Sequence, residues 1–491
     1  WVSVPSVVFF STLWWVFLSG MCRRTRFIGL GILAAIAGLF LGLFRWEGFS
    51  GDFLPQFTFR WSPSAEERAE EYWASVSTIV EMTETTDSGA PLEITATDWP
   101  QFRGPNRDGI VTDSAIRRDW KSNPPQLLWK HPLGKGWSSF AVVDRFAFTQ
   151  EQRGEQECVV CYDIETGEHV WTHSDTVRFK SFQGGPGPMA TPTLFDSRVY
   201  SVGGKGLLNC LEARTGKQVW STNILDDADA QNLTWGMSGS PLVYDDVVVV
   251  NPGGGQGNSV AAYDRLTGEK LWTAGNEPAG YSSPSLAVID GVRQVLVFHN
   301  IGICGYHAGT GEQLWTFNLW KNHSSANAAQ PIVRDEKQIF ISCGYGKGSA
   351  LLEVTKEGAQ WIVKDKKINS QTLHMKFTSG VYKDGYVYGL DERILSCVEF
   401  NTGQRKWRKR GKFGYGQLLL VDDALLILTE SGEVVLFEAK PNSPRELGRF
   451  KAIEGITWNH PVLHKGRLLV RNGEEVACYD LRSDSAITQN D

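Results

Sequence analysis

Short apolar runs alternate with polar turns over most of the chain from residue 126 onward. One pattern recurs in these runs: an apolar stretch ends in a polar residue, Thr-Gly follows shortly after, and a Trp lies five residues beyond the Thr. Apolar runs of this length between turn residues predict β-strands. Clear copies of the pattern cover Cys161–Trp171, Cys210–Trp220, Ala262–Trp272, Tyr306–Trp315 and Val398–Trp407, and a degenerate copy covers Glu353–Trp361.

The tryptophans of this pattern define a long period. Trp129, Trp171, Trp220, Trp272, Trp315, Trp361 and Trp407 are separated by 42, 49, 52, 43, 46 and 46 residues, and Phe450 takes the next position, 43 residues on. A period of roughly 40–50 residues with several short strands in each unit predicts a β-propeller. We therefore interpret these tryptophans as structural residues that pack between neighbouring blades.

The number of blades follows from the inner strands. Seven units begin with an inner strand near residues 138, 190, 238, 282, 329, 377 and 416. An eighth unit begins at Trp458 and ends at Asp480 without an outer strand, and the isolated strand around Trp129 can supply it. We predict an all-β, monomeric propeller of eight four-stranded blades over residues 126–482, closed by the two chain ends because closure removes free sheet edges; residues 483–491 form a tail.

The motif also explains most of the cysteines. Cys161, Cys210 and Cys397 lie five residues before the Thr of their repeats, and Cys478 matches them in the last unit. One cysteine per blade cannot pair with another, so we interpret this position as a small buried slot. Cys158 and Cys161 would point to opposite faces of one strand, which argues against a redox C-x-x-C.

The N-terminal region predicts a membrane anchor. Apolar stretches cover Val2–Gly20 and Phe27–Phe44, and the basic run Cys22–Arg26 lies between them. Residues 1–20 are expected to be an apolar extension before a natural start at Met21, and residues 21–45 a single uncleaved transmembrane helix. The arginines should stay in the cytoplasm, which places the propeller on the periplasmic, extracytoplasmic side. Residues 46–98 are expected to be a partly helical spacer.

Charge excludes one class of partner. The net charge of −6 gives no indication of nucleic-acid binding. The basic run Arg405–Arg410 falls in a predicted outer strand, where charged residues commonly protect an exposed sheet edge.

Aligned inner strands predict a site at the mouth of the central channel. One level holds Ser139, Thr191, Ser240, Ser283, Gln330, Ser379, Gln417 and His460, and a partly aromatic rim lies two residues earlier in each strand. Such positions can bind a ligand; alternatively, the aromatics seal gaps between blades and the polar residues satisfy strand-end backbone. The candidate ligand-binding residues are Trp137, Tyr281, His323, His374, Tyr415, Trp458, Asn459 and His460. The sequence shows no catalytic triad or zinc-ligand spacing, so no catalytic or metal-binding residue is predicted.

The repeat resembles that of the pyrroloquinoline-quinone (PQQ)-like β-propeller family. Before it, Trp99–Gly109 (WPQFRGPNRDG) resembles the segment that precedes such propellers in planctomycete-type bacterial proteins, and residues 99–125 form a pre-propeller segment. The resemblance implies one of two functions. The first is a quinoprotein dehydrogenase that oxidises alcohols or sugars with PQQ and Ca²⁺. The second is a non-catalytic scaffold like the propeller lipoprotein of the outer-membrane β-barrel assembly machinery.

Several features favour the scaffold. The sequence has no adjacent cysteine pair and no C-x-x-C-H haem motif, and Asn327 and Asn459 have no acidic residue at a matching inner-strand position. We therefore expect a protein or peptide partner and no cofactor, with PQQ-dependent oxidation as the alternative.

Overall fold

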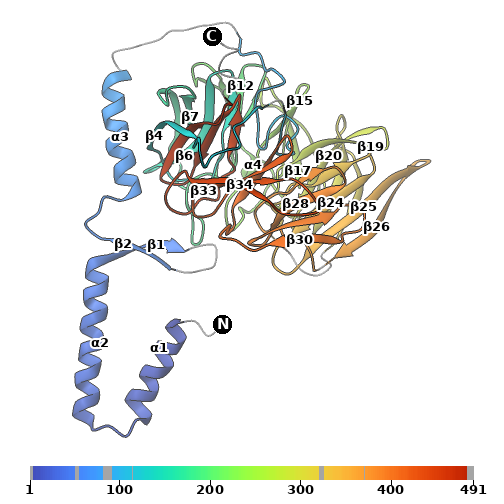
Figure 1. Cartoon of the computed structure of the whole chain (residues 1–491). Helices are drawn as coiled ribbons and strands as arrows, with labels where there is room; N and C mark the ends of the chain where they lie inside the picture. Colours follow the sequence, from blue (N-terminus) through green and yellow to red (C-terminus); the bar gives the residue numbers. More distant parts are fainter. Residues whose placement is uncertain are drawn as a thin grey trace. The chain divides into compact units, whose positions relative to one another are not determined.

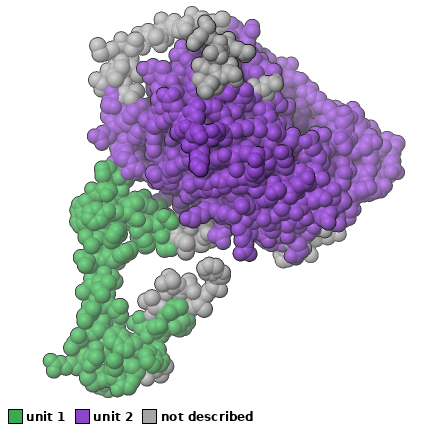
Figure 2. Space-filling model, viewed as in Figure 1, with its two compact units in different colours: residues 1–64 green, residues 65–491 purple. Residues whose placement is uncertain are grey.

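The computed structural model describes residues 4–49, 55–80, 91–112, 114–319, 326–369 and 371–483. The chain divides into two compact units, residues 1–64 and 65–491 (Figure 2). The first unit contains α1 (Val4–Leu13), a π-helix (Trp14–Leu18), α2 (Arg23–Leu43), β1 (Phe44–Phe49) and β2 (Pro55–Phe59). Helix α2 has a mean hydropathy of 2.1 and is the described helix that is long and apolar enough to cross a bilayer, a test that a signal sequence also passes.

The second unit is the predicted eight-bladed propeller of four-stranded antiparallel sheets (Figure 1). Blades 1 to 4 comprise β5 (Ala141–Val143), β6 (Phe146–Arg153), β7 (Gln156–Asp163), β8 (His169–Asp175); β11 (Thr193–Phe195), β12 (Arg198–Val202), β13 (Leu207–Glu212), β14 (Gln218–Asn223); β15 (Leu242–Tyr244), β16 (Val247–Val250), β17 (Val260–Asp264), β18 (Lys270–Ala274); β19 (Ser285–Ile289), β20 (Val292–His299), β21 (Gly302–His307) and β22 (Gln313–Phe317).

The remaining blades continue the same order. Blades 5 to 8 comprise β23 (Ile332–Arg334), β24 (Gln338–Cys343), β25 (Gly348–Glu357), β26 (Gln360–Asn369); β27 (Val381–Lys383), β28 (Tyr386–Asp391), β29 (Ile394–Glu399), β30 (Arg405–Lys409); β31 (Gln417–Val421), β32 (Ala424–Leu428), β33 (Glu433–Glu438), β34 (Glu446–Lys451); β35 (Val462–His464), β36 (Arg467–Arg471), β37 (Glu475–Asp480) and β4 (Gln126–Pro132). Smaller elements are β3 (Ile110–Val111), which adds to blade 7, the pair β9 (Lys180–Ser181) and β10 (Gly185–Pro186), and helix α4 (Ile224–Asp227).

The two ends of the propeller close the ring as expected. Strand β4 pairs antiparallel with β37, where Trp129 lies opposite Cys478 and Leu127 lies opposite Tyr479. The outer strand of the last blade therefore comes from the start of the domain, so no blade is left incomplete.

Repeat tryptophans such as Trp129 and Trp171 stabilise the junction with the next blade. The rings of Trp129 and Trp171 lie against Gly167 and Gly216, the Thr-Gly glycines of the following blades, where an added Cβ would lie 2.5 and 2.4 Å from the ring. Both glycines have positive φ (77° and 69°), so the turn requires glycine for its backbone conformation as well as for space. The Trp171 indole N–H also donates to the carbonyl of Ala213 in the next blade, at 2.9 Å.

Two positions of the period differ from the expectation. Trp361 does not lie in the register of the other repeat tryptophans, because Lys367 is opposite Leu351 at the equivalent bulge and Trp361 pairs with Lys356 farther along a longer hairpin. The junction after blade 7 differs as well: Gly448 takes the equivalent place, and Trp120 from the pre-propeller segment covers it. A long-range tertiary contact thus replaces the local motif there.

The cysteines of the motif are buried single thiols. Cys161, Cys210, Cys397 and Cys478 have no exposed surface and are free. Cys158 and Cys161 belong to two different core clusters on either face of blade 1, as the alternation of a strand requires.

Helix α3 (Ala65–Val80) lies within the region expected to be a spacer and packs on the propeller beside β4 and β6 (Figure 1). Trp73 is 8% exposed, and the Arg153 guanidinium lies 3.6 Å from the centroid of its ring. Tyr72 stacks on His131 with the ring centroids 4.9 Å apart. The helix is therefore held by aromatic and cation–π contacts with blades 1 and 8.

Candidate functional site

The polar residues at the inner level form a belt of hydrogen bonds between blades. The backbone N–H groups of Ser139, Thr191 and Ser240 donate to the hydroxyls of the next blade's residue at 3.1, 2.9 and 2.9 Å. The Gln330 N–H donates to Ser379 Oγ at 3.0 Å, and the Ser139 hydroxyl donates to the His460 carbonyl at 2.7 Å. All of these residues are buried. The polar side chains of the belt therefore satisfy backbone groups at the ends of the inner strands. This is the structural one of the two interpretations of the polar inner level.

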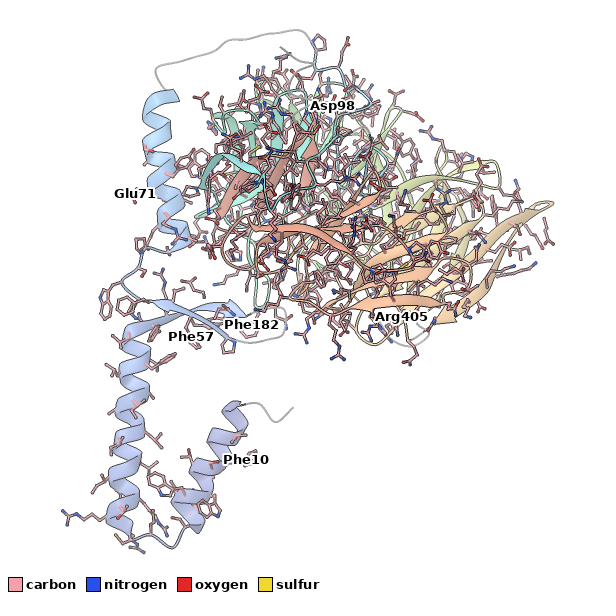
Figure 3. All side chains as sticks on the ribbon, viewed as in Figure 1. Phe10, Phe57, Glu71, Asp98, Phe182 and Arg405 are labelled. Carbon is pink, nitrogen blue, oxygen red and sulfur yellow. The ribbon has the colours of Figure 1, made fainter. Side chains whose placement is uncertain are left out.

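The pre-propeller segment enters the channel at the other end of the inner strands. Trp99 exchanges backbone hydrogen bonds with Val142 in the middle of β5, at 2.8 and 2.7 Å. Asp98, which is 2% exposed and labelled in Figure 3, fixes the start of the segment by accepting from the N–H groups of Thr95 and Asp144. The segment then places Arg103 and Arg107 among the inner strands.

These two arginines plug the channel with buried positive charge. Arg107 donates to the carbonyls of Ser240, Pro241 and Pro284, in blades 3 and 4. Arg103 donates to the carbonyl of Gly380 in blade 6 at 2.8 Å. Burial lowers the pKa of Arg103 to about 10 and that of Arg107 to about 9. The two guanidinium groups thus donate hydrogen bonds to backbone carbonyls of blades 3, 4 and 6.

The aromatic rim forms a collar at the opposite mouth. The Trp137 and Trp458 ring centroids are 4.6 Å apart, and Phe377 lies 5.4 Å from Trp458 and 5.1 Å from Tyr415. The Lys376 ammonium lies 4.6 Å from the centroid of Tyr415. These residues come from blades 1, 6, 7 and 8, so only the closed ring brings them together.

The collar continues on the other side of the mouth. Tyr281 lies 5.3 Å from Trp235, and Lys376 lies 5.1 Å from Tyr345, which is 45% exposed and has a φ of 58°. The Trp137 indole donates to the Gly184 carbonyl at 2.6 Å. The collar is thus a mostly half-buried aromatic surface, with Tyr345 exposed and Tyr415 buried, beside the Lys376 ammonium.

The candidate residues separate into three groups in the structure. Trp137, Tyr281, Tyr415 and Trp458 join the collar. Asn459 and His460 lie buried behind it, where the Asn459 amide donates to the Ser138 carbonyl at 2.7 Å. Burial and the nearby Arg103 charge lower the pKa of His460 well below its ordinary value.

Of the two remaining histidines, His374 is among the residues that the structure describes. His374 faces a separate cleft that it shares with Asp391. His323 lies outside the described residues.

Alignment of inner strands alone missed the residues that complete the mouth. Glu430 follows β32 and accepts from the Trp458 indole at 2.8 Å and from the Tyr415 N–H at 3.3 Å. Lys376 and Tyr345 also lie outside the inner level. In each blade the second strand runs back to the same mouth. The residues that follow the second strands, such as Glu430, were therefore the sequence signal for this part of the mouth.

The described residues assemble no cluster of carboxylates that would hold the Ca²⁺ of a PQQ site. Calcium requires roughly six to eight oxygen ligands, with carboxylates among them. No group of three or more His, Cys, Asp or Glu side chains that could hold a metal occurs among the described residues. Buried Arg103 also adds a positive charge near His460, which disfavours a divalent cation at that position.

Comparison with known proteins identifies the family. The profile described as "Outer membrane protein assembly factor BamB" matches residues 155–409, just over half of the chain. The chain belongs to this PQQ-like propeller family. Among solved structures, BamB from Moraxella catarrhalis superposes with a TM-score of 0.51 at 14% identity, covering 73% of this chain and 98% of that chain.

Quinoprotein enzymes share the PQQ-like propeller. The quinohemoprotein alcohol dehydrogenase of Comamonas testosteroni superposes with a TM-score of 0.58 at 14% identity, covering 83% of this chain and 84% of that chain. In sequence, the same-named protein of that organism is 30% identical over 127 residues, 25% of this chain and 18% of its own length. A europium-containing methanol dehydrogenase gives a TM-score of 0.60 at 12% identity, over 78% and 91% of the two chains. At these identities the structural likeness establishes the fold alone.

Proposed function

We propose that this PQQ-like propeller is a membrane-anchored, extracytoplasmic platform that binds a protein or peptide partner. The plugged channel supports the proposal most directly. Arg103 and Arg107 occupy one end, and the belt consumes the hydroxyls of the inner strands, so the channel offers few groups for chemistry. The collar remains as an aromatic surface, and aromatic rings supply large contact areas at protein interfaces.

The membrane anchor rests on helix α2. Its 21 residues begin with Arg23 and Arg24, and no other charged residue follows Arg26 within the helix. A 21-residue helix is about 30 Å long, which matches the hydrocarbon core of a bilayer. The basic flank favours a cytoplasmic N-terminal side, and this supports our inference that the propeller lies outside the cytoplasm. A reporter fused after Asp491 should therefore be active only in the extracytoplasmic compartment; activity only in the cytoplasm would contradict this topology.

PQQ-dependent oxidation of alcohols or sugars is the alternative. The test is dye-linked oxidation by the purified full chain with PQQ and Ca²⁺ added. We expect no turnover above the rate without protein. Turnover that disappears in a Trp458→Ala, His460→Ala double variant would refute the platform and place a quinone at the mouth.

Partner binding is tested by photo-crosslinking in membranes. A benzophenone amino acid at the position of Tyr345, in the collar, should yield a discrete crosslinked protein. The same probe at Val288 is the control, because Val288 is 42% exposed and lies near the other end of an inner strand. Equal crosslinking at both positions would contradict a specific mouth surface.

A further inference from the structure

A charged cleft lies beside the collar, at the junction of blades 5 and 6. Its volume is about 400 Å³, and Gly346 of blade 5 lines it together with His374, Asp391, Glu392, Arg393 and Arg408 of blade 6. It adjoins the collar through two short segments, residues 344–346 and 374–376. Gly344 packs against Lys376, which is a collar residue two positions after His374. The cleft and the collar can therefore contact one extended ligand.

Asp391 organises the cations of the cleft. Its carboxylate is 3% exposed, and one oxygen accepts from the His374 backbone N–H at 3.0 Å and lies 2.7 Å from Nδ1 of the same residue. The second oxygen lies 3.3 Å from Arg405 and 3.4 Å from Arg408. Burial alone would raise the pKa of Asp391, but the hydrogen bonds from His374 lower it overall, so the carboxylate stays charged. The His374 ring and the Arg408 guanidinium, which line the cleft, are thus held in place before any ligand arrives, together with Arg405 outside the lining.

The surface outside the cleft is rich in lysine and arginine, of which Lys366 pairs with Glu353 and Lys406 with Glu399. Strand β30, on which Figure 3 labels Arg405, continues into exposed Arg410 and is itself the outer strand of blade 6. Exposed Lys364, Lys366 and Lys367 lie on β26, the outer strand of blade 5, and the Asn369 amide of β26 donates to the Gly403 carbonyl next to β30. This concentration of cations occurs in a chain whose net charge is −6. Such a patch attracts anionic ligands.

We propose that this cleft binds carboxylates of an acidic, extended peptide segment of the partner, while apolar residues of the same segment lie on the collar. The inference rests on the platform function proposed above. Arginine pairs recognise carboxylates by charge-assisted hydrogen bonds. Glu392 and Glu399 interrupt the basic surface, so a polymer with a negative charge on every unit would meet repulsion, whereas a peptide with spaced carboxylates would not. The outer strands also present backbone edges that only a polypeptide can pair with.

The test is direct binding of a labelled peptide to the purified full chain in detergent. The probe is a fluorescein-labelled peptide that alternates Asp with Val, and the matched control replaces every Asp with Asn. We expect the Asp peptide to bind at least about tenfold more tightly than the Asn peptide, with an affinity that falls as salt rises.

Variants locate the binding to the cleft. Arg393→Gln with Arg408→Gln should weaken peptide binding by about tenfold or more, whereas Lys409→Gln with Arg410→Gln removes the same charge next to the cleft and should change it less than about threefold. Arg408 pairs with Asp391, so its replacement also removes an ion pair within the protein. Arg393→Gln alone is therefore the second variant, and it should weaken binding by about threefold with an unchanged thermal unfolding curve.

The outcomes distinguish this inference from the platform function. Equal binding of the Asp and Asn peptides, equal effects of the two double variants, or displacement of the peptide by polygalacturonate at lower concentration would overturn the acidic-peptide cleft. If crosslinking at Tyr345 still traps a partner in that case, the platform function survives and only the ligand chemistry proposed here fails.

Discussion

Replacing Trp171 with Ala tests the role of the repeat tryptophans. The ring is 7% exposed, lies on Gly216 of the next blade, and donates its indole N–H to Ala213. A buried Trp removes about 200 Å² from water, which at about 25 cal/mol/Å² gives an upper value of about 5 kcal/mol. The lost hydrogen bond adds about 1 kcal/mol, while partial collapse of the cavity offsets part of the total. We expect Trp171→Ala to lower the free energy of unfolding by about 4 kcal/mol.

Trp361→Ala is the matched control because it removes the same side chain from the sixth copy of the motif. Trp361 lies outside the docking register, near Lys356 on the β25–β26 hairpin, and is only partly buried. Its replacement should cost about 1 kcal/mol. Urea unfolding of the full chain, followed by circular dichroism, measures both values. We infer that the position of a Trp in the strand register, and not its presence in the sequence motif, decides whether it docks on the next blade. Equal losses in the free energy of unfolding for the two substitutions would refute this inference.

Three further predictions concern buried charges. Arg107→Met should destabilise the protein by about 3 kcal/mol in urea unfolding, because three carbonyls at about 1–3 kcal/mol each lose their donor while the cost of burying the cation is relieved; an unchanged midpoint would contradict the plug. Burial raises the pKa of Glu157 to about 7, so stability should fall as pH rises from about 4.5 to about 7, and Glu157→Gln should exceed wild-type stability at pH 8 by about 3 kcal/mol, with no gain at pH 4. Burial and the Arg153 charge lower the pKa of His169 to about 4, so its contribution to stability changes with pH in the opposite direction. Stability should fall by about 2 kcal/mol as pH drops from about 6.5 to about 4. If a His169→Gln variant keeps the same pH slope in thermal unfolding, His169 is not the source of that slope.

Sequence reasoning found half of the mouth. Trp137 and Trp458 were predicted because both start inner strands, and the aligned repeats place equivalent residues at one level. Sequence reasoning missed Glu430, Lys376 and Tyr345, because they lie at strand ends and turns. The direction of their side chains is set only when the blade folds. The repeat therefore predicts positions on its own strands but not the side chains that adjacent blades contribute between them.

The pre-propeller segment shows the same limit more sharply. Its likeness to other proteins was visible in the sequence, but nothing in the order of its residues indicated that Arg107 would donate to carbonyls in blades 3 and 4. Gln101 is a local acceptor for this buried guanidinium, but the three carbonyls that accept from it are more than a hundred residues away in the chain.

The sequence by itself determined the blade, the number of blades and the closure of the ring. The blade and the blade number depend on local patterns: alternation within strands, a glycine turn, and a tryptophan five residues after the Thr. The closure follows from the isolated strand of Trp129 and the incomplete last unit, which pair in the structure with Trp129 opposite Cys478. Tertiary structure alone decided that Trp120 replaces a repeat tryptophan, that the hydroxyls of the inner level form a belt, and that His374 belongs to a cleft instead of the channel. The physical reason is that these features are contacts between blades, and the distances between blades are set by the closed ring rather than by any one repeat.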